Sequence, residues 1–227
     1  MTPDTQRRRY GLLLITLLAA YLLSALLHSR WIGAVEVGLF TIAGLLALRN
    51  SPVHGRAGQL AISAGLMASV ALIVVSATLP SDTGRALVFI WTTVLLLLTV
   101  LVLVRQILLM PTVTLQSICG AVSAYMIIGL MFAAIYAASY YLNERTFFAG
   151  NQPANGATFQ YFSFTTLTTL GYGDFTAAHS GGQAIAMIEA MTGQIFLATL
   201  VARLVAAFRP APQNGQQTGA DDDRRSS

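Results

Sequence analysis

Apolar and polar positions alternate in long blocks along this chain, with six apolar runs separated by short polar breaks. The runs cover residues 10–27, 31–48, 57–79, 86–110, 117–142 and 183–208. Each run approaches or exceeds the roughly 20 apolar residues that a helix needs to cross the hydrocarbon core of a bilayer. The pattern therefore predicts an all-α membrane protein with six transmembrane helices.

The segment between the last two runs is shorter and more polar than a spanning helix. Residues 158–168 follow a polar loop at 143–157, and residues 175–182 lead into the sixth run. We expect residues 158–168 to form a re-entrant half-helix, which enters the membrane and returns to the same side. The negative end of its dipole, at its carboxyl terminus, would then favour a cation near the middle of the membrane.

Two features of the first two runs have more than one interpretation. The basic residues 7–9 suit either a cleaved signal peptide or a retained first helix, and we favour the helix because no neat cleavage site follows. Glu36 lies inside the second run, where a carboxylate is by default a functional candidate. The helix dipole also favours an acid in the first turns of a helix, and we favour that structural role.

The composition narrows the class of protein further. The chain is 55% hydrophobic and 10% charged, whereas soluble domains have roughly 25% charged residues. The net charge of +4 comes from arginine alone, and the arginines gather at both ends and in alternate connections. Because cytoplasmic segments carry an excess of basic residues, we expect a multi-pass protein of the cell membrane with both termini cytoplasmic and lipid as a partner. This topology accounts for the arginines, so we expect no nucleic-acid partner.

The sequence YFSFTTLTTLGYGD at residues 161–174 has the pattern that points to a specific chemistry. Gly171 and Gly173 alternate with larger residues, so a positive φ can recur at both without a Cβ clash. Alternating backbone handedness turns successive carbonyl oxygens toward one side. Four such strands around an axis would stack rings of oxygens that replace the hydration shell of K+. Thr169 would add a ring of hydroxyls, and the side chain of Tyr172 would point away from the axis and brace the wall.

These residues resemble the signature sequence of potassium channels, in a variant that has Leu170 where Val or Ile is commoner. Tyr161 and Phe162 stand where the pore helix of that family carries an aromatic pair. Residues 189–205 resemble the inner helix of small prokaryotic members, with Gly193 at the position of the gating-hinge glycine. The resemblance covers residues 117–208.

The resemblance implies a potassium-selective channel that conducts passively and is neither an enzyme nor dependent on a cofactor. One filter per chain requires a homotetramer, because four walls must surround the pore. The residues to which it assigns roles are Thr169, Leu170, Gly171, Tyr172 and Gly173 as the selectivity filter that binds K+, Asp174 at the filter mouth, Gly193 as gating hinge, and Tyr161, Phe162, Thr165, Thr168 and Glu189 as support of the pore helix.

The predicted runs group into four parts of the chain. The parts are a cytoplasmic N-terminus at 1–9, a four-helix peripheral domain at 10–110, a pore domain at 111–209 and a disordered cytoplasmic tail at 210–227. The peripheral domain occupies the place of a voltage sensor, but its fourth run carries only Arg85 and Arg105, one near each end. Because a voltage sensor needs a ladder of arginines within the membrane, we expect no gating by such a ladder.

Two other functions remain as alternatives to a potassium channel. Residues 171–174 also fit the GxGD pattern of intramembrane aspartyl proteases, whose chemistry needs a second aspartate in the membrane. The other aspartates, Asp4, Asp82 and those at 221–223, lie outside the apolar runs. The second alternative is a non-selective cation channel.

Three single residues also have two interpretations each, and a fourth, Thr165, departs from the family pattern. Gly193 is either a hinge or a small residue packed against the pore helix. Glu189 lies four residues earlier, on the same helix face, and we favour a hydrogen bond to the pore helix over a pH gate. Thr165 stands where some channels have a glutamate that pairs with the aspartate after the filter, so that carboxylate pair is absent. We favour a solvated His179 over a proton sensor at the mouth.

Overall fold

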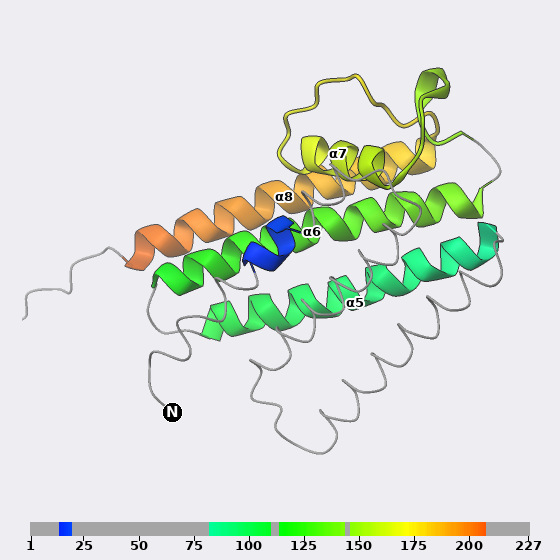
Figure 1. Cartoon of the computed structure of the whole chain (residues 1–227). Coiled ribbons are helices and arrows are strands. Elements are labelled where there is room, and N and C mark those ends of the chain that lie inside the picture. Colours follow the sequence, from blue (N-terminus) through cyan, green and yellow to red (C-terminus); the bar gives the residue numbers. More distant parts are fainter. Residues whose placement is uncertain (1–13, 20–81, 110–113, 144–145, 208–227) are drawn as a thin grey trace, which may run out of the picture.

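The computed structural model describes residues 14–19, 82–109, 114–143 and 146–207 (Figure 1). This part of the chain folds into the helices α5 (Asp82–Leu109), α6 (Leu115–Leu142), α7 (Gly156–Leu167) and α8 (Ser180–Ala207), with a short 3-10 turn η1 at Ala149–Asn151. Three of these helices, α5, α6 and α8, are long and apolar enough to cross a membrane. The described part is therefore an all-α membrane protein.

These three long helices correspond to the last three predicted runs. Residues 14–19 are also helical, and Leu17 joins the same hydrophobic core. The remainder of the first three runs, with Glu36, lies outside the described residues, so the count of six helices stays a prediction. The helix α5 begins at Asp82, four residues before the predicted run at 86–110. In its first turn, the Arg85 guanidinium and the Asp82 carboxylate form an ion pair at 3.4 Å.

The helix α6 is the central element of the described fold. In its most apolar stretch 72% of the residues are buried, compared with 28% in α5 and 11% in α8. The helices α5 and α8 lie along α6, and α7 rests across one end of the α6–α8 pair (Figure 1). The side chain of Thr114 caps the first turn of α6 in a reciprocal capping box with Ser117.

The loop between α6 and α7 departs from the sequence prediction. Residues 143–157 were expected to be a polar loop, but the exposed fractions of Phe147 and Phe148 are only 7% and 1%. Backbone hydrogen bonds run from the amide of Ala149 to the carbonyl of Thr176 and from the amide of Ala178 to the carbonyl of Phe147, both at 2.9 Å. The loop is therefore paired with the segment that precedes α8, and its two phenylalanines complete the core beneath α7.

Candidate functional site

The helix α7 is a short, capped helix that presents its carboxyl end to the GYG stretch. The Asn155 side chain accepts from the amide of Thr158, at 3.0 Å, and the Thr158 hydroxyl accepts from the amide of Asn155, at 2.9 Å. This capping box satisfies amides that the first turn leaves unpaired. Phe162 anchors the buried face, with its ring centroid 5.0 Å from that of Tyr136 in α6. The helix spans 156–167, close to the predicted 158–168.

The chain after α7 folds back on the last turn of the helix. The amides of Leu170 and Gly171 donate to the Thr165 carbonyl at 2.9 and 3.0 Å, and the amide of Thr169 donates to that of Thr166 at 2.9 Å. These bonds satisfy carbonyl groups that the end of a helix leaves unpaired. The amides of residues 169–171 therefore face the last turn of α7.

Backbone handedness alternates through the same residues. The φ angles are +58° at Thr169, +49° at Gly171 and +79° at Gly173. Positive φ at both glycines agrees with the sequence prediction. The positive φ at Thr169 was not predicted, since a side chain disfavours that region. Every second residue of 169–173 is thus left-handed, which is the alternation that turns carbonyl groups to one side.

The carbonyl oxygens of residues 169–173 differ in their hydrogen bonding from the amides of residues 169–171. Outside the helices of the described chain, none of the backbone hydrogen bonds ends on a carbonyl oxygen of this stretch. All five residues are exposed in the single chain. Because carbonyl groups need a partner when a structure buries them, this row of oxygens has the capacity to bind a cation or water.

Asp174 is held by three hydrogen bonds at the outer end of the stretch. Its Oδ2 accepts from the Tyr161 hydroxyl at 2.8 Å, its Oδ1 from the amide of Phe175 at 3.0 Å, and its carbonyl from the Gln152 side chain at 2.6 Å. The hydrogen bond from Tyr161 raises the pKa of that phenol to about 12, so the phenol stays protonated at physiological pH.

The ring of Tyr161 also stacks on the ring of Tyr172, with centroids 6.4 Å apart and planes 6° from parallel. Tyr172 therefore packs against α7, as expected of a side chain that points away from the axis. The sequence showed that Thr165 removes a carboxylate pair, but it did not reveal that Tyr161 bonds Asp174 instead. Thirteen residues separate the two, and no local periodicity signals such a contact.

The hydroxyl groups of Thr165, Thr168 and Thr169 bond to nearby backbone carbonyls. Those of Thr165 and Thr168 donate to the carbonyls of Phe162, at 3.0 Å, and Phe164, at 2.6 Å. The hydroxyl of Thr169 donates to the Thr168 carbonyl at 2.7 Å. Thr165 and Thr168 thus satisfy carbonyl groups of α7 itself, and their role in supporting a pore stays a prediction.

Gly193 lies where α8 crosses the end of α7. A Cβ built on Gly193 would overlap the carbonyl oxygen of Leu167 and lie 2.9 Å from its Cδ1 atom. The same carbonyl accepts a hydrogen bond from the Tyr125 hydroxyl of α6 at 3.0 Å. The helix α8 continues through position 193. This geometry favours the packing role over the hinge, and bending at Gly193 stays a prediction.

Glu189 is fully buried one turn before Gly193. Its carboxyl group contacts the Ser163 hydroxyl of α7 and, at 2.5 Å, the Tyr136 hydroxyl of α6. The predicted contact between Glu189 and the pore helix is thus present. The sequence did not identify Ser163 or Tyr136 as its partners, because both residue types are common in apolar helices.

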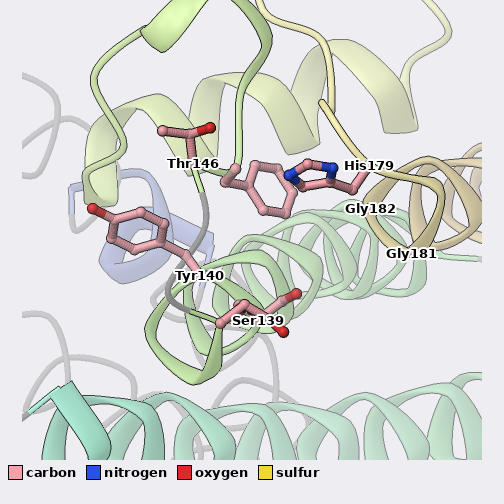
Figure 2. A pocket seen from close by; sticks show the side chains of 8 residues that line it. Ser139, Tyr140, Thr146, His179, Gly181 and Gly182 are labelled. Atoms are coloured by element: carbon pink, nitrogen blue, oxygen red, sulfur yellow. Dashed lines mark hydrogen bonds between the residues drawn. The ribbon is translucent and has the colours of Figure 1, made fainter.

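A separate cavity of about 340 Å³ lies between the end of α6, the following loop and the start of α8 (Figure 2). His179 is exposed and lines this cavity together with side chains such as Tyr140 and Thr146. None of the residues predicted for the filter or its support lines it. The cavity is therefore distinct from the candidate site.

The described residues do not assemble the machinery of an aspartyl protease. Their two aspartates are Asp82, which contacts Arg85 at the start of α5, and Asp174, which is exposed and bonded to Tyr161. No cluster of three or more His, Cys, Asp or Glu residues that suits a metal ion occurs among the residues described.

Comparison with known proteins gives one match. Residues 126–209 match the model of a family described as an ion channel. The match begins within α6 and includes α7, the 169–174 stretch and α8. No curated protein and no solved structure matches the chain. The family match indicates a transport function rather than an enzymatic one.

Proposed function

We propose that the protein is a potassium-selective channel that conducts K+ passively through a filter formed by residues 169–173, a proposal that the match of residues 126–209 to an ion channel family supports. One observation carries the proposal. Left-handed φ at Thr169, Gly171 and Gly173 accompanies amides that bond back to α7, so the backbone is turned with its carbonyl groups toward the opposite side.

The chemistry follows from the arrangement of these oxygens. Rings of carbonyl oxygens, one from each strand, replace the hydration shell of a permeating K+. The carboxyl end of α7 lies immediately before the filter and adds the negative end of a helix dipole. Asp174 adds a carboxylate at the outer mouth, and its bonds to Tyr161 and Phe175 hold it in place.

Four copies of the chain are needed to close such a pore. Each chain provides one wall, so the assembly is a homotetramer with cyclic symmetry. The single chain leaves α8 largely uncovered, which supports a contact between copies along that helix. Its large exposed apolar residues are Met187, Ile188, Met191, Ile195, Leu197, Val201 and Val205.

The placement in the membrane completes the proposal. The channel is a multi-pass protein of the cell membrane with both termini cytoplasmic, and α7 enters from outside. The helix α5 carries arginine only at positions 85 and 105, so the channel is not gated by an arginine ladder. The positive-inside distribution of arginine supports this orientation.

The test is potassium flux from proteoliposomes that contain the purified protein, at zero voltage, with sodium flux and barium block as controls. Flux that prefers K+ and is blocked by barium is the expected result. Equal K+ and Na+ flux would show a non-selective cation channel instead. A count of subunits in the same sample tests the tetramer.

Gly171→Ala gives a sharper version of this test. It places a Cβ at a positive φ and should abolish selectivity or current, since an L side chain is strained there. The matched control is Gly150→Ala in η1, where φ is +71° and no atom lies within 4 Å of the added Cβ. Equal flux from both variants would remove the argument that residues 169–173 form the filter.

A further inference from the structure

A buried cluster of oxygen atoms joins α6, α7 and α8 behind the filter. Tyr136, Ser163 and Glu189 each have an exposed fraction of 0%. The Ser163 Oγ atom contacts Glu189 Oε1 on one side and the carbonyl oxygen of Gly129, at 2.6 Å, on the other. The Tyr136 hydroxyl contacts Glu189 Oε2 at 2.5 Å. Four oxygen-bearing groups are therefore linked in one chain of short contacts.

The number of hydrogens in this chain fixes the protonation of Glu189. A serine hydroxyl has one hydrogen, and a backbone carbonyl has none. If Ser163 donates to Gly129, the contact between Ser163 and Glu189 needs a hydrogen from the carboxyl group. Tyr136 uses its own hydrogen on Oε2. All contacts are satisfied as full hydrogen bonds only when Oε1 carries a proton and donates to Ser163.

The surroundings of Glu189 agree with a neutral carboxyl group. The only ion pair among the described residues is Arg85–Asp82, so no described cation within ion-pair distance balances a charge at Glu189. The titratable groups that face it are Tyr136 and Tyr125, both from α6. From α7 the titratable residue is Tyr161, which bonds Asp174. Arg203 in α8 and His179, which immediately precedes α8, are both ten or more residues from Glu189 along the chain. A buried carboxylate with no cationic partner is strongly disfavoured.

We propose that Glu189 is a neutral carboxylic acid and a positioning residue, whose proton ties α8 to α7 through Ser163 and so fixes the helix that bears the filter. This inference rests on the proposed channel function. Ser163 and Leu167 are one turn apart on α7, and they contact Glu189 and Gly193, which are one turn apart on α8. The Ser163–Glu189 contact is thus one of two successive contacts that set the position of the last turn of α7. Loss of its proton removes the donor to Ser163 and weakens this link.

Three variants distinguish the role of the Glu189 proton from the need for a side chain of similar size at that position. Glu189→Gln keeps the hydrogen-bond pattern of the neutral acid, because its amide nitrogen donates to Ser163 and its oxygen accepts from Tyr136. It should conduct K+ at nearly the wild-type rate. Glu189→Ala and Ser163→Ala remove the link and should lower K+ flux roughly tenfold. If Glu189→Gln loses as much flux as Glu189→Ala, the neutral-acid role is wrong.

The pH profile of flux gives a second measurement, which a merely structural role would not change. Wild-type flux should fall as the pH rises through the ionisation of Glu189, while the flux of Glu189→Gln should not fall in that range. Identical profiles for the two proteins would contradict the role of the proton.

The protonation state is also measurable without any flux. The chain has three glutamates, at positions 36, 144 and 189, so isotope labelling of the glutamate carboxyl carbon gives a spectrum in which Glu189 is assigned by its loss in Glu189→Gln. We expect its signal to be that of a protonated acid at neutral pH. Asp82→Asn is the control, because it removes an exposed carboxylate and should leave all glutamate signals in place.

The two measurements keep the proposals distinct. A protonated Glu189 in a protein with no K+ flux would reject the channel function and the positioning role, but it would still show that Glu189 is a neutral acid. An ionised Glu189 in a protein that conducts K+ would reject this inference alone.

Discussion

Replacement of Gly193 by alanine tests how α8 packs against α7. The added methyl group would overlap the Leu167 carbonyl oxygen and lie 2.9 Å from the Leu167 Cδ1 atom. A rotamer change moves the leucine side chain but not the carbonyl, which belongs to the backbone of α7. The carbonyl is further held by the hydroxyl of Tyr125. Gly193→Ala must therefore displace one helix from the other.

The expected cost follows from three contributions. Forcing a methyl group into a packed site costs about 1–3 kcal/mol. Loss of the Tyr125–Leu167 hydrogen bond costs about 1 kcal/mol more. The higher helix propensity of alanine offsets about 1 kcal/mol. Gly193→Ala should therefore destabilise each subunit by about 1–3 kcal/mol.

Gly181→Ala is the matched control in the same helix, because no atom lies within 4 Å of a Cβ at that position. The assay is the midpoint of thermal unfolding of the purified protein, together with its K+ flux. We expect Gly193→Ala to unfold at a lower temperature than wild type and Gly181→Ala to unfold at the same or a higher temperature. If Gly193→Ala matches Gly181→Ala in stability and changes only the flux, Gly193 acts as a hinge and the packing argument is refuted.

The remaining predictions concern the outer side of the proposed filter. Tyr161→Phe keeps the stack on Tyr172 but removes the bond to Asp174, so selectivity for K+ over Na+ should fall, and an absorbance titration should lose one tyrosine that ionises at about pH 12. The pKa of Tyr161 is raised above its ordinary value of 10.0 by its hydrogen bond to Asp174. This bond therefore contributes fully to the stability of the folded state below pH 10.0, and the contribution is lost as the pH rises through about 12. Phe148→Ala should destabilise the fold by about 3–5 kcal/mol, because Phe148 is only 1% exposed and packs on Phe159 and Phe162. The measurement is the unfolding temperature, which should fall. An unchanged unfolding temperature would show that the loop between α6 and α7 does not contribute to the core.

Local patterns in the sequence predicted the described helices well. Apolar length alone located α5, α6 and α8, and the shorter polar segment located α7. The positive φ at Gly171 and Gly173 followed from the need of a left-handed backbone for glycine. The predictions for the first three runs, apart from residues 14–19, concern residues outside the described structure and stay predictions.

Such local patterns could not predict contacts between residues that are far apart along the chain. Phe147 and Phe148 lie among polar residues, and only the pairing of their backbone with residues 176–178 brings them into the core. The partners of Glu189 are 26 and 53 residues away along the chain. Burial of Glu189 was predictable from its position in an apolar run, but the hydrogen count at Ser163 required the positions of three helices.

The backbone pairing between residues 147–149 and 176–178 has a consequence for how the protein tolerates changes in the length of the chain. The two bonds close the chain into a ring that contains η1, α7 and residues 169–173, and they hold both ends of this ring next to each other. Because the ends of this ring are already joined, the connection from α6 at residues 143–146 does not determine the distance between them. Lengthening that connection costs only the slowly growing entropy of a longer loop. The geometry of residues 169–173 therefore does not depend on the length of the chain that leads into the ring from α6.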